Sequence, residues 1–120
     1  MAYDESLANR VVRVFLEKNI EVEEKKMMGG LCFMVDGKMC CGLLMDKKTQ
    51  ENLLMARIGE IAYEQAIEKE ECIPMEFTGR AMKGFVFVLE AGFESDQALT
   101  YWIDLCLAYN PLAKASKKKA

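Results

Sequence analysis

The stretch from Gly29 to Met45, GGLCFMVDGKMCCGLLM, constrains the fold more than any other part of the sequence. Two apolar runs flank Asp36-Gly37, and a two-residue Asp-Gly loop between such runs is among the strongest local signals for a β-hairpin. In a regular hairpin this loop fixes the facing pairs, which are Val35 and Lys38, Met34 and Met39, Phe33 and Cys40, and Cys32 and Cys41.

Both faces of the predicted ribbon are apolar. One face carries Leu31, Phe33, Val35, Cys40 and Leu44, and the other carries Cys32, Met34, Met39, Cys41, Leu43 and Met45. An antiparallel sheet with one side in water alternates apolar and polar residues, which this ribbon does not do. We therefore expect both sides to be covered, one by the chain's own helices and the other by a second copy of the chain.

Helical and strand periodicities predict the order of the elements. Helices are predicted at 4–18, 59–71 and 95–111, with Asp4 or Ser6 capping the first and Ser95 capping the third, and strands at 21–28, on both sides of the hairpin loop, and at 53–58, 73–77 and 85–89. This order predicts the α+β class, with two layers: an antiparallel sheet of five to six strands and three helices, in the order helix, strands, helix, two strands, helix.

Two apolar stripes run along the predicted third helix. One consists of Leu99, Trp102, Ile103 and Cys106, and the other of Ala98, Tyr101, Leu105, Ala108 and Leu112. A helix that is apolar on two sides is typically buried on both. We therefore expect both stripes to be covered.

The length and the charge of the chain limit its organisation and its partners. With 120 residues we expect one domain over 1–112, followed by a disordered, lysine-bearing tail at 113–120. Residues 1–113 carry 12 basic and 19 acidic groups, and the resulting charge of −7 repels a phosphate backbone unless basic residues cluster. The sequence has neither a signal-peptide core nor an apolar run of membrane-spanning length, so we expect a cytoplasmic protein that does not bind membranes.

The chain has five cysteines and no histidine. Histidine is the commonest general base near neutral pH and the commonest metal ligand, and the cysteine spacing does not match a zinc site. Thiols inside apolar runs also lack a base to activate them. We therefore predict no catalytic residue, no metal and no cofactor, and we expect reduced thiols. The predicted register would allow Cys32 and Cys41 to form a disulfide in an oxidised sample.

Three groups of residues are candidate binding sites, and each also has a simpler structural interpretation. The first is an anion-binding loop with two glycines and two cations, or simply a connecting loop: Thr78, Gly79, Arg80, Lys83 and Gly84. The second is a basic patch, or simply a solvated strand edge: Lys25, Lys26 and Arg57. The third is a protein-interaction surface on the second face of the ribbon, or simply core filling: Met34, Met39, Cys41 and Leu43.

Four stretches together resemble the N-terminal domain of the TfoX/Sxy family of bacterial competence regulators. They are KKMMGGLCFMVDGKMCCG (25–42), ARIG (56–59), MEFTGRAMKGFVFV (75–88) and the helix around Tyr101-Trp102. The resemblance covers roughly residues 1–112, with Met28 in place of the usual phenylalanine and Ala81 in place of the usual proline. It implies a two-layer α+β domain with a regulatory role and no catalytic residue set. Because competence regulators of this family also carry a C-terminal domain, we expect a stand-alone form of the N-terminal one.

These observations lead to one functional hypothesis and two alternatives. We expect a non-enzymatic, cytoplasmic regulatory or protein-interaction module that binds a protein of a regulatory pathway and forms a homodimer. The first alternative is direct nucleic-acid binding through the basic patch together with Arg80, Lys83 and the lysine-bearing tail, although no aromatic residues are interleaved with these cations as a stacking platform would require. The second is a small molecule or anion bound at residues 78–84.

Overall fold

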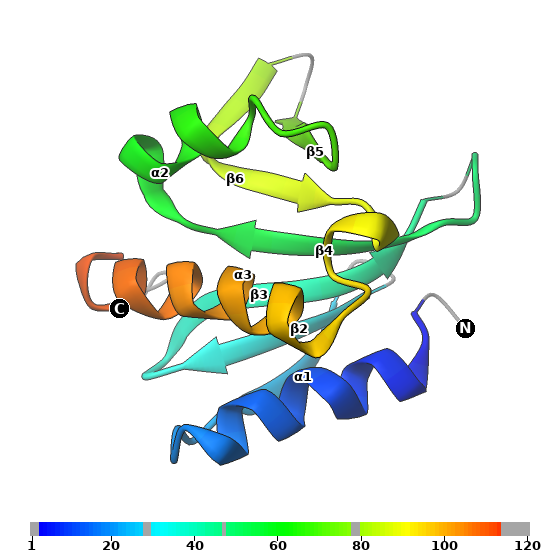
Figure 1. Cartoon of the computed structure of the whole chain (residues 1–120). Coiled ribbons are helices and arrows are strands. Elements are labelled where there is room, and N and C mark those ends of the chain that lie inside the picture. The colour runs from blue at the N-terminus through cyan, green and yellow to red at the C-terminus, as the bar shows by residue number, and fades with distance from the viewer. Residues whose placement is uncertain (1–2, 28–29, 47, 78–79, 114–120) are drawn as a thin grey trace.

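Across residues 3–27, 30–46, 48–77 and 80–113, which the computed structural model describes, six antiparallel strands form one sheet and helices pack on one of its faces (Figure 1). The strand order across the sheet is β1-β2-β3-β4-β6-β5. The elements are α1 (Glu5–Glu17), β1 (Glu23–Met27), β2 (Gly30–Val35), β3 (Lys38–Met45), β4 (Asn52–Arg57), α2 (Gly59–Ala66), β5 (Cys72–Phe77), β6 (Arg80–Val88), α3 (Asp96–Tyr109), and the short 3-10 helices η1 (Glu90–Gly92) and η2 (Asn110–Leu112). The predicted α+β class and element order are confirmed. None of the described helices is long and apolar enough to cross a membrane.

Side-chain caps begin two of the helices, as the sequence predicts. The Asp4 carboxylate accepts hydrogen bonds from the backbone N–H groups of Ser6 (2.8 Å) and Leu7 (3.4 Å). The Ser95 hydroxyl oxygen accepts one from the N–H of Ala98 (3.0 Å). A helix leaves its first N–H groups without intrahelical partners, and these caps supply them. The caps therefore determine where α1 and α3 begin above the sheet.

The β2–β3 hairpin contains a bulge that changes its predicted register. Asp36 (φ 56°) and Gly37 (φ 74°) form the predicted two-residue turn, and the first two predicted pairs are present. The register then shifts, so that Phe33 lies opposite Cys41 instead of Cys40. The predicted pairs beyond the shift were wrong because a ribbon with two apolar faces has no alternation to reveal an extra residue.

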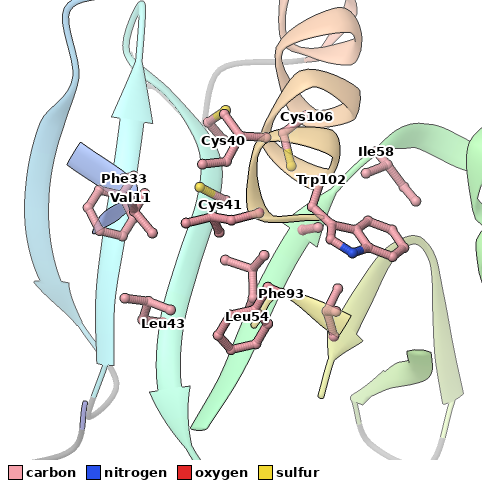
Figure 2. Packing of buried hydrophobic residues seen from close by; sticks show 14 of the residues in the cluster. Val11, Phe33, Cys40, Cys41, Leu43, Leu54, Ile58, Phe93, Trp102 and Cys106 are labelled. Carbon is pink, nitrogen blue, oxygen red and sulfur yellow. The ribbon is translucent and has the colours of Figure 1, made fainter. Parts of the chain in front are cut away.

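The shift places Cys41 and Leu43 on the face that the helices cover. Both belong to the core cluster between the helices and the sheet (Figure 2). The largest fully buried side chains of this core are Trp102, Phe15, Phe33, Phe93 and Leu54. The indole N–H of Trp102 donates to the carbonyl oxygen of Gly92 at 3.0 Å, so the one polar atom of this side chain is paired inside the core.

The opposite face of the sheet is also buried at its centre. Cys32 and Leu53 are 4% exposed, and Met34 and Met55 are 7% exposed. They alternate along their strands with residues of the core cluster, such as Phe33, and therefore point away from the helices. The expectation that both sides are covered is met for these residues. Because it is met within one chain, no second copy is needed to keep them from water.

The outer stripe of α3 is not buried, contrary to the prediction. The inner stripe is fully buried, with Leu99, Trp102, Ile103 and Cys106 each at most 1% exposed. In the outer stripe Tyr101 is 46% exposed, Leu112 is 76% exposed, Ala108 is exposed, and Ala98 and Leu105 are half-buried. One side of α3 therefore packs on the sheet, and the other presents apolar side chains to solvent.

Two predicted boundaries also differ. β6 begins at Arg80, so residues 80–84, predicted as part of a turn, belong to a strand. Ala113, predicted as the first residue of a disordered tail, is 6% exposed, and its N–H donates to the carbonyl oxygen of Asn110 (3.1 Å). The rest of the predicted tail, 114–120, lies outside the described residues.

Candidate functional site

The predicted anion-binding loop is mostly strand. Thr78 and Gly79 lie outside the described residues, and Arg80 and Lys83 are positions of β6. Gly84 has a φ of +100°, and its carbonyl oxygen accepts a hydrogen bond from the N–H of Ile58 (2.8 Å). A Cβ at Gly84 would lie 3.5 Å from the backbone of Gly59, so this glycine brings β6 close to the start of α2. The described part of the stretch thus has a packing role, and anion binding stays a prediction.

The residues of the predicted basic patch are not brought together. Lys25 pairs with Cys32 and Lys26 with Leu31, so the two lysines point to opposite faces of the sheet. Arg57 lies on β4, three strands away from β1 in the sheet order. Arg57 is separated from the two lysines by the order of the strands in the sheet, which local sequence patterns do not indicate.

The Arg57 side chain contacts two aromatic rings and a backbone carbonyl of its own chain. Its guanidinium lies 5.4 Å from the ring centroid of Phe85 and 5.9 Å from that of Tyr109, and it donates a hydrogen bond to the carbonyl oxygen of Met39 (3.4 Å). Cation–π contacts with two rings, one from the sheet and one from α3, tie these elements together. Arg57 therefore holds the end of α3 against β4.

The predicted interaction surface is largely inside the molecule. Cys41 is 0% and Leu43 2% exposed on the helix side, whereas Met34 is 7% exposed on the opposite side. Met39 alone among the four is half-buried. The four residues therefore do not form one accessible face, and the bulge in the hairpin is the reason.

A cluster of three thiols that the sequence pattern does not predict lies between β3 and α3. Cys40 and Cys41 of β3 lie beside Cys106 of α3 there (Figure 2), and each is at most 1% exposed. The spacing of these cysteines gave no signal, because Cys106 approaches the pair only after the chain has folded. Among the described residues no group of three or more His, Cys, Asp or Glu side chains is placed to hold a metal ion.

The thiols of the cluster modify one another's acidity. Hydrogen bonds from Cys106 and then Cys41, together with the charge of Arg57, lower the pKa of Cys40. The hydrogen bond that Cys106 donates to Cys40 raises the pKa of Cys106, and the bond between Cys41 and Cys106 raises that of Cys41; burial adds to both increases. A thiolate is a nucleophile only toward a substrate that reaches it. At 1% exposure Cys40 offers no such access.

The remaining cysteines behave as small buried apolar residues. Burial raises the pKa of Cys72 to about 11, and burial also raises the pKa of Cys32. Cys32 lies opposite Gly42, and its thiol donates to the Met34 sulfur at 3.6 Å. All five cysteines are free thiols, and the register shift removes the predicted approach of Cys32 to Cys41.

Two hollows on the described surface are large enough to accept a side chain or a small ligand. One, of about 360 Å³, lies beside the first half of α3 and is lined by residues that include Lys69, Glu71, Ser95 and Tyr101. The other, of about 420 Å³, lies near the hairpin turn and is lined by Glu21, Val22, Glu23, Met34, Asp36 and Gly37. The three carboxylates of the second hollow oppose an anionic ligand.

Comparison with known families gives a match that covers the whole sheet, α2 and α3. The model of the TfoX N-terminal domain matches residues 15–109, which run from α1 to the end of α3. Comparison with curated proteins gave no match, and comparison with solved structures gave none either. With a family match over most of its length, this chain belongs to the TfoX N-terminal domain family.

Proposed function

We propose that this chain is a non-enzymatic, cytoplasmic regulatory module that acts by binding another protein. The observation that carries the proposal is the match to the TfoX N-terminal domain over residues 15–109. Competence regulators contain this domain, and the resemblance brings no catalytic residue set with it. A regulatory module without chemistry of its own acts through its surface.

The position of the reactive groups supports a role without catalysis. The five thiols are the strongest nucleophiles in the chain, and each is at most 6% exposed. An active site requires a nucleophile, a base and a substrate to meet in a cavity. The two hollows described above contain none of the thiols.

The same structure favours a protein partner over nucleic acid. Lys25 and Lys26 point to opposite faces, and Arg57 is held between two rings. Binding to a phosphate backbone needs several cations on one surface. The dispersed cations and the charge of −7 over residues 1–113 oppose that mode.

The homodimer was expected because the second face of the sheet would otherwise meet water, and this reason is weaker in the folded chain. Met34 and Met55, at the centre of the face that a second copy was expected to cover, are 7% exposed in one chain. We therefore propose a contact with a different protein. The mass of the chain in solution, measured by light scattering, tests this, and a stable dimer whose contacts map to β2–β4 would restore the homodimer.

A capture experiment tests the function itself. The immobilised chain is exposed to an extract of its source cells, with excess free chain as competitor, and captured proteins are identified by mass spectrometry. We expect one protein to be retained and displaced by the free chain. In parallel, duplex DNA should show no retention that strengthens as salt falls from ~200 to ~50 mM. No displaceable protein, together with salt-dependent DNA retention, would contradict the proposal.

A further inference from the structure

The outer stripe of α3 has the spacing of a helix-packing seam. Ala98, Tyr101, Leu105 and Ala108 follow one another at intervals of three, four and three residues. This spacing places apolar side chains along one line of a helix, where a second helix can pack against them. The two alanines are small enough to let the backbone of a second helix approach closely. In this chain the stripe faces outward, since Tyr101 is 46% exposed and Ala108 is exposed.

The segment that contains α2 contacts α3 near both ends of this stripe. At one end, a Cβ on Gly59 would lie 2.6 Å from the ring of Tyr109. At the other end, the ammonium of Lys69 lies 5.5 Å from the ring centroid of Tyr101. The hollow of about 360 Å³ lies at that second end, lined by Lys69, Glu71 and Tyr101 among others. The stripe is therefore bordered at both ends, and at one of them a hollow can take an anchoring side chain.

The negative charge of the molecule is concentrated in the same layer. Residues 59–71 contain five glutamates and one lysine, and residues 90–112 contain four acidic residues and no basic one, so each segment carries −4. Of the nine acidic side chains, eight are exposed. Residues 4–18, which include α1, have three acidic and three basic residues and add no net charge. The helix layer thus carries −8, which is more than the whole of the −7 over residues 1–113.

The distribution of charge also determines which partner fits. Two copies of the chain joined through α3 would bring two layers of −8 together, and like charges across an interface oppose association. A helix that carries lysine or arginine beside its apolar residues meets attraction instead, and long-range attraction accelerates its encounter with the acidic layer.

We propose that the four residues of the outer stripe that lie on α3 itself, Ala98–Tyr101–Leu105–Ala108, bind a basic amphipathic helix of another protein. This inference rests on the proposed function and adds to it the surface and the chemistry of the partner. The partner helix places its apolar side chains on the stripe and its cations toward the acidic layer. From Ala98 to Ala108 the stripe covers ten residue steps, or about 15 Å, so the contact spans about three turns of α3.

A defined peptide tests the proposal without an unknown partner. The probe is a fluorescent peptide of about 14–18 residues, with leucine at helical spacing and lysine beside it, and its binding to the whole chain is measured by anisotropy. A peptide of the same composition in scrambled order has the same charge but no apolar stripe. We expect the ordered peptide to bind at least about tenfold more tightly than the scrambled one, and its binding to weaken as salt rises. Equal binding of the two peptides would overturn the proposal.

Matched variants locate the contact. Tyr101→Lys with Ala108→Lys places two cations on the stripe and should weaken peptide binding by about tenfold or more. The control is Asn9→Lys with Leu16→Lys, which adds the same charge at the same seven-residue spacing to exposed positions of α1. Ala108→Lys alone serves as a second variant because it leaves the contact between Tyr101 and Trp102 intact. Circular dichroism confirms that each variant is folded. Equal weakening by the stripe and control pairs would overturn the assignment.

Three further outcomes distinguish a failure of this inference from a failure of the proposed function. If a protein captured from the extract is retained by both the original chain and the stripe variant, the regulatory function stands and the α3 surface is wrong. If nothing is captured by either, the function itself fails. If the original chain is a dimer in solution and the stripe variant is a monomer, the stripe binds a second copy and the basic-helix partner is excluded.

Discussion

Asn110, at the end of α3, donates a hydrogen bond from Nδ2 to the carbonyl oxygen of Val35, 3.1 Å away at the end of β2. Asn110 is 3% exposed. The carbonyl oxygen of Asn110 accepts a further bond from Lys38 Nζ at 3.3 Å. Two residues that flank the hairpin turn are thereby joined to the same helix end. The contact fixes where α3 ends relative to the sheet, and hence the position of its outer stripe.

Asn110→Ala should destabilise the protein. The substitution removes the bond to Val35 and leaves a buried cavity, which we expect to lower the free energy of unfolding by about 1–3 kcal/mol. Urea unfolding followed by Trp102 fluorescence measures the change. Asn9→Ala, on the exposed side of α1, is the control and should change stability by no more than about 0.5 kcal/mol. Equal effects of the two substitutions would show that the Asn110 bond adds nothing to stability.

Gly59→Ala should cost more stability than Gly37→Ala, although both glycines have a positive φ. The φ values are +87° at Gly59 and +74° at Gly37, and a left-handed alanine costs about 1–2 kcal/mol in either place. At Gly59 the new Cβ would also lie 2.6 Å from the ring of Tyr109, whereas at Gly37 nothing lies within 4 Å. Displacing the ring should add about 1–3 kcal/mol. Thermal unfolding of the two variants compares them, and equal losses would mean that Tyr109 does not pack against Gly59.

The thiols of the folded protein should react slowly with Ellman's reagent. All five are at most 6% exposed, and the pKa values of Cys32, Cys41, Cys72 and Cys106 are raised, so the thiolate of each forms only at high pH. We expect little reaction at about pH 8 in the folded state and five thiols per chain in denaturant. Cys40→Ser tests the exception, because the pKa of Cys40 is lowered. If one thiol of the original chain reacts rapidly and this rapid reaction is absent from the Cys40→Ser variant, then the reagent reaches the cluster.

The parts of the fold that local chemistry determines were predicted from the sequence. Asp4 and Ser95 cap their helices, and Asp36-Gly37 forms its turn, because each depends on hydrogen bonds or torsion angles within a few residues. The bulge near Cys40 was missed because apolar residues continue on both faces and no polar residue marks the shift.

The parts that depend on distant contacts could not be predicted in this way. Hydrophobicity indicates that Tyr101 and Ala108 favour apolar surroundings. It does not indicate whether other residues of the same chain cover these side chains. In the folded chain both residues are exposed to solvent. The residues of the predicted basic patch are not brought together for a related reason. The position of Arg57 relative to Lys25 depends on the order of the strands in the sheet. A candidate site assembled from several elements therefore requires the topology as well as the residue types.

The cap of α1 should make stability depend on pH through Asp4. The Ser6 hydroxyl donates to the Asp4 carboxylate at 2.6 Å, and this bond, followed by the backbone bonds of Ser6 and Leu7, lowers the pKa of Asp4 below 3.8. Because the pKa is lower in the folded state, the ionised carboxylate stabilises the fold above the unfolded pKa, and that contribution is lost as pH falls through the folded value. Asp4→Asn keeps a capping side chain but does not titrate.

The difference in unfolding free energy between the original chain and Asp4→Asn should thus be constant from about pH 7 to about pH 5 and should shrink below about pH 4. Urea unfolding across this range measures it. Ser6→Ala removes the donor that shifts the pKa most, so in that background the difference should shrink by a smaller amount and finish shrinking at a higher pH. A difference that stays constant down to about pH 2 would mean that the Asp4 carboxylate does not cap α1 in solution.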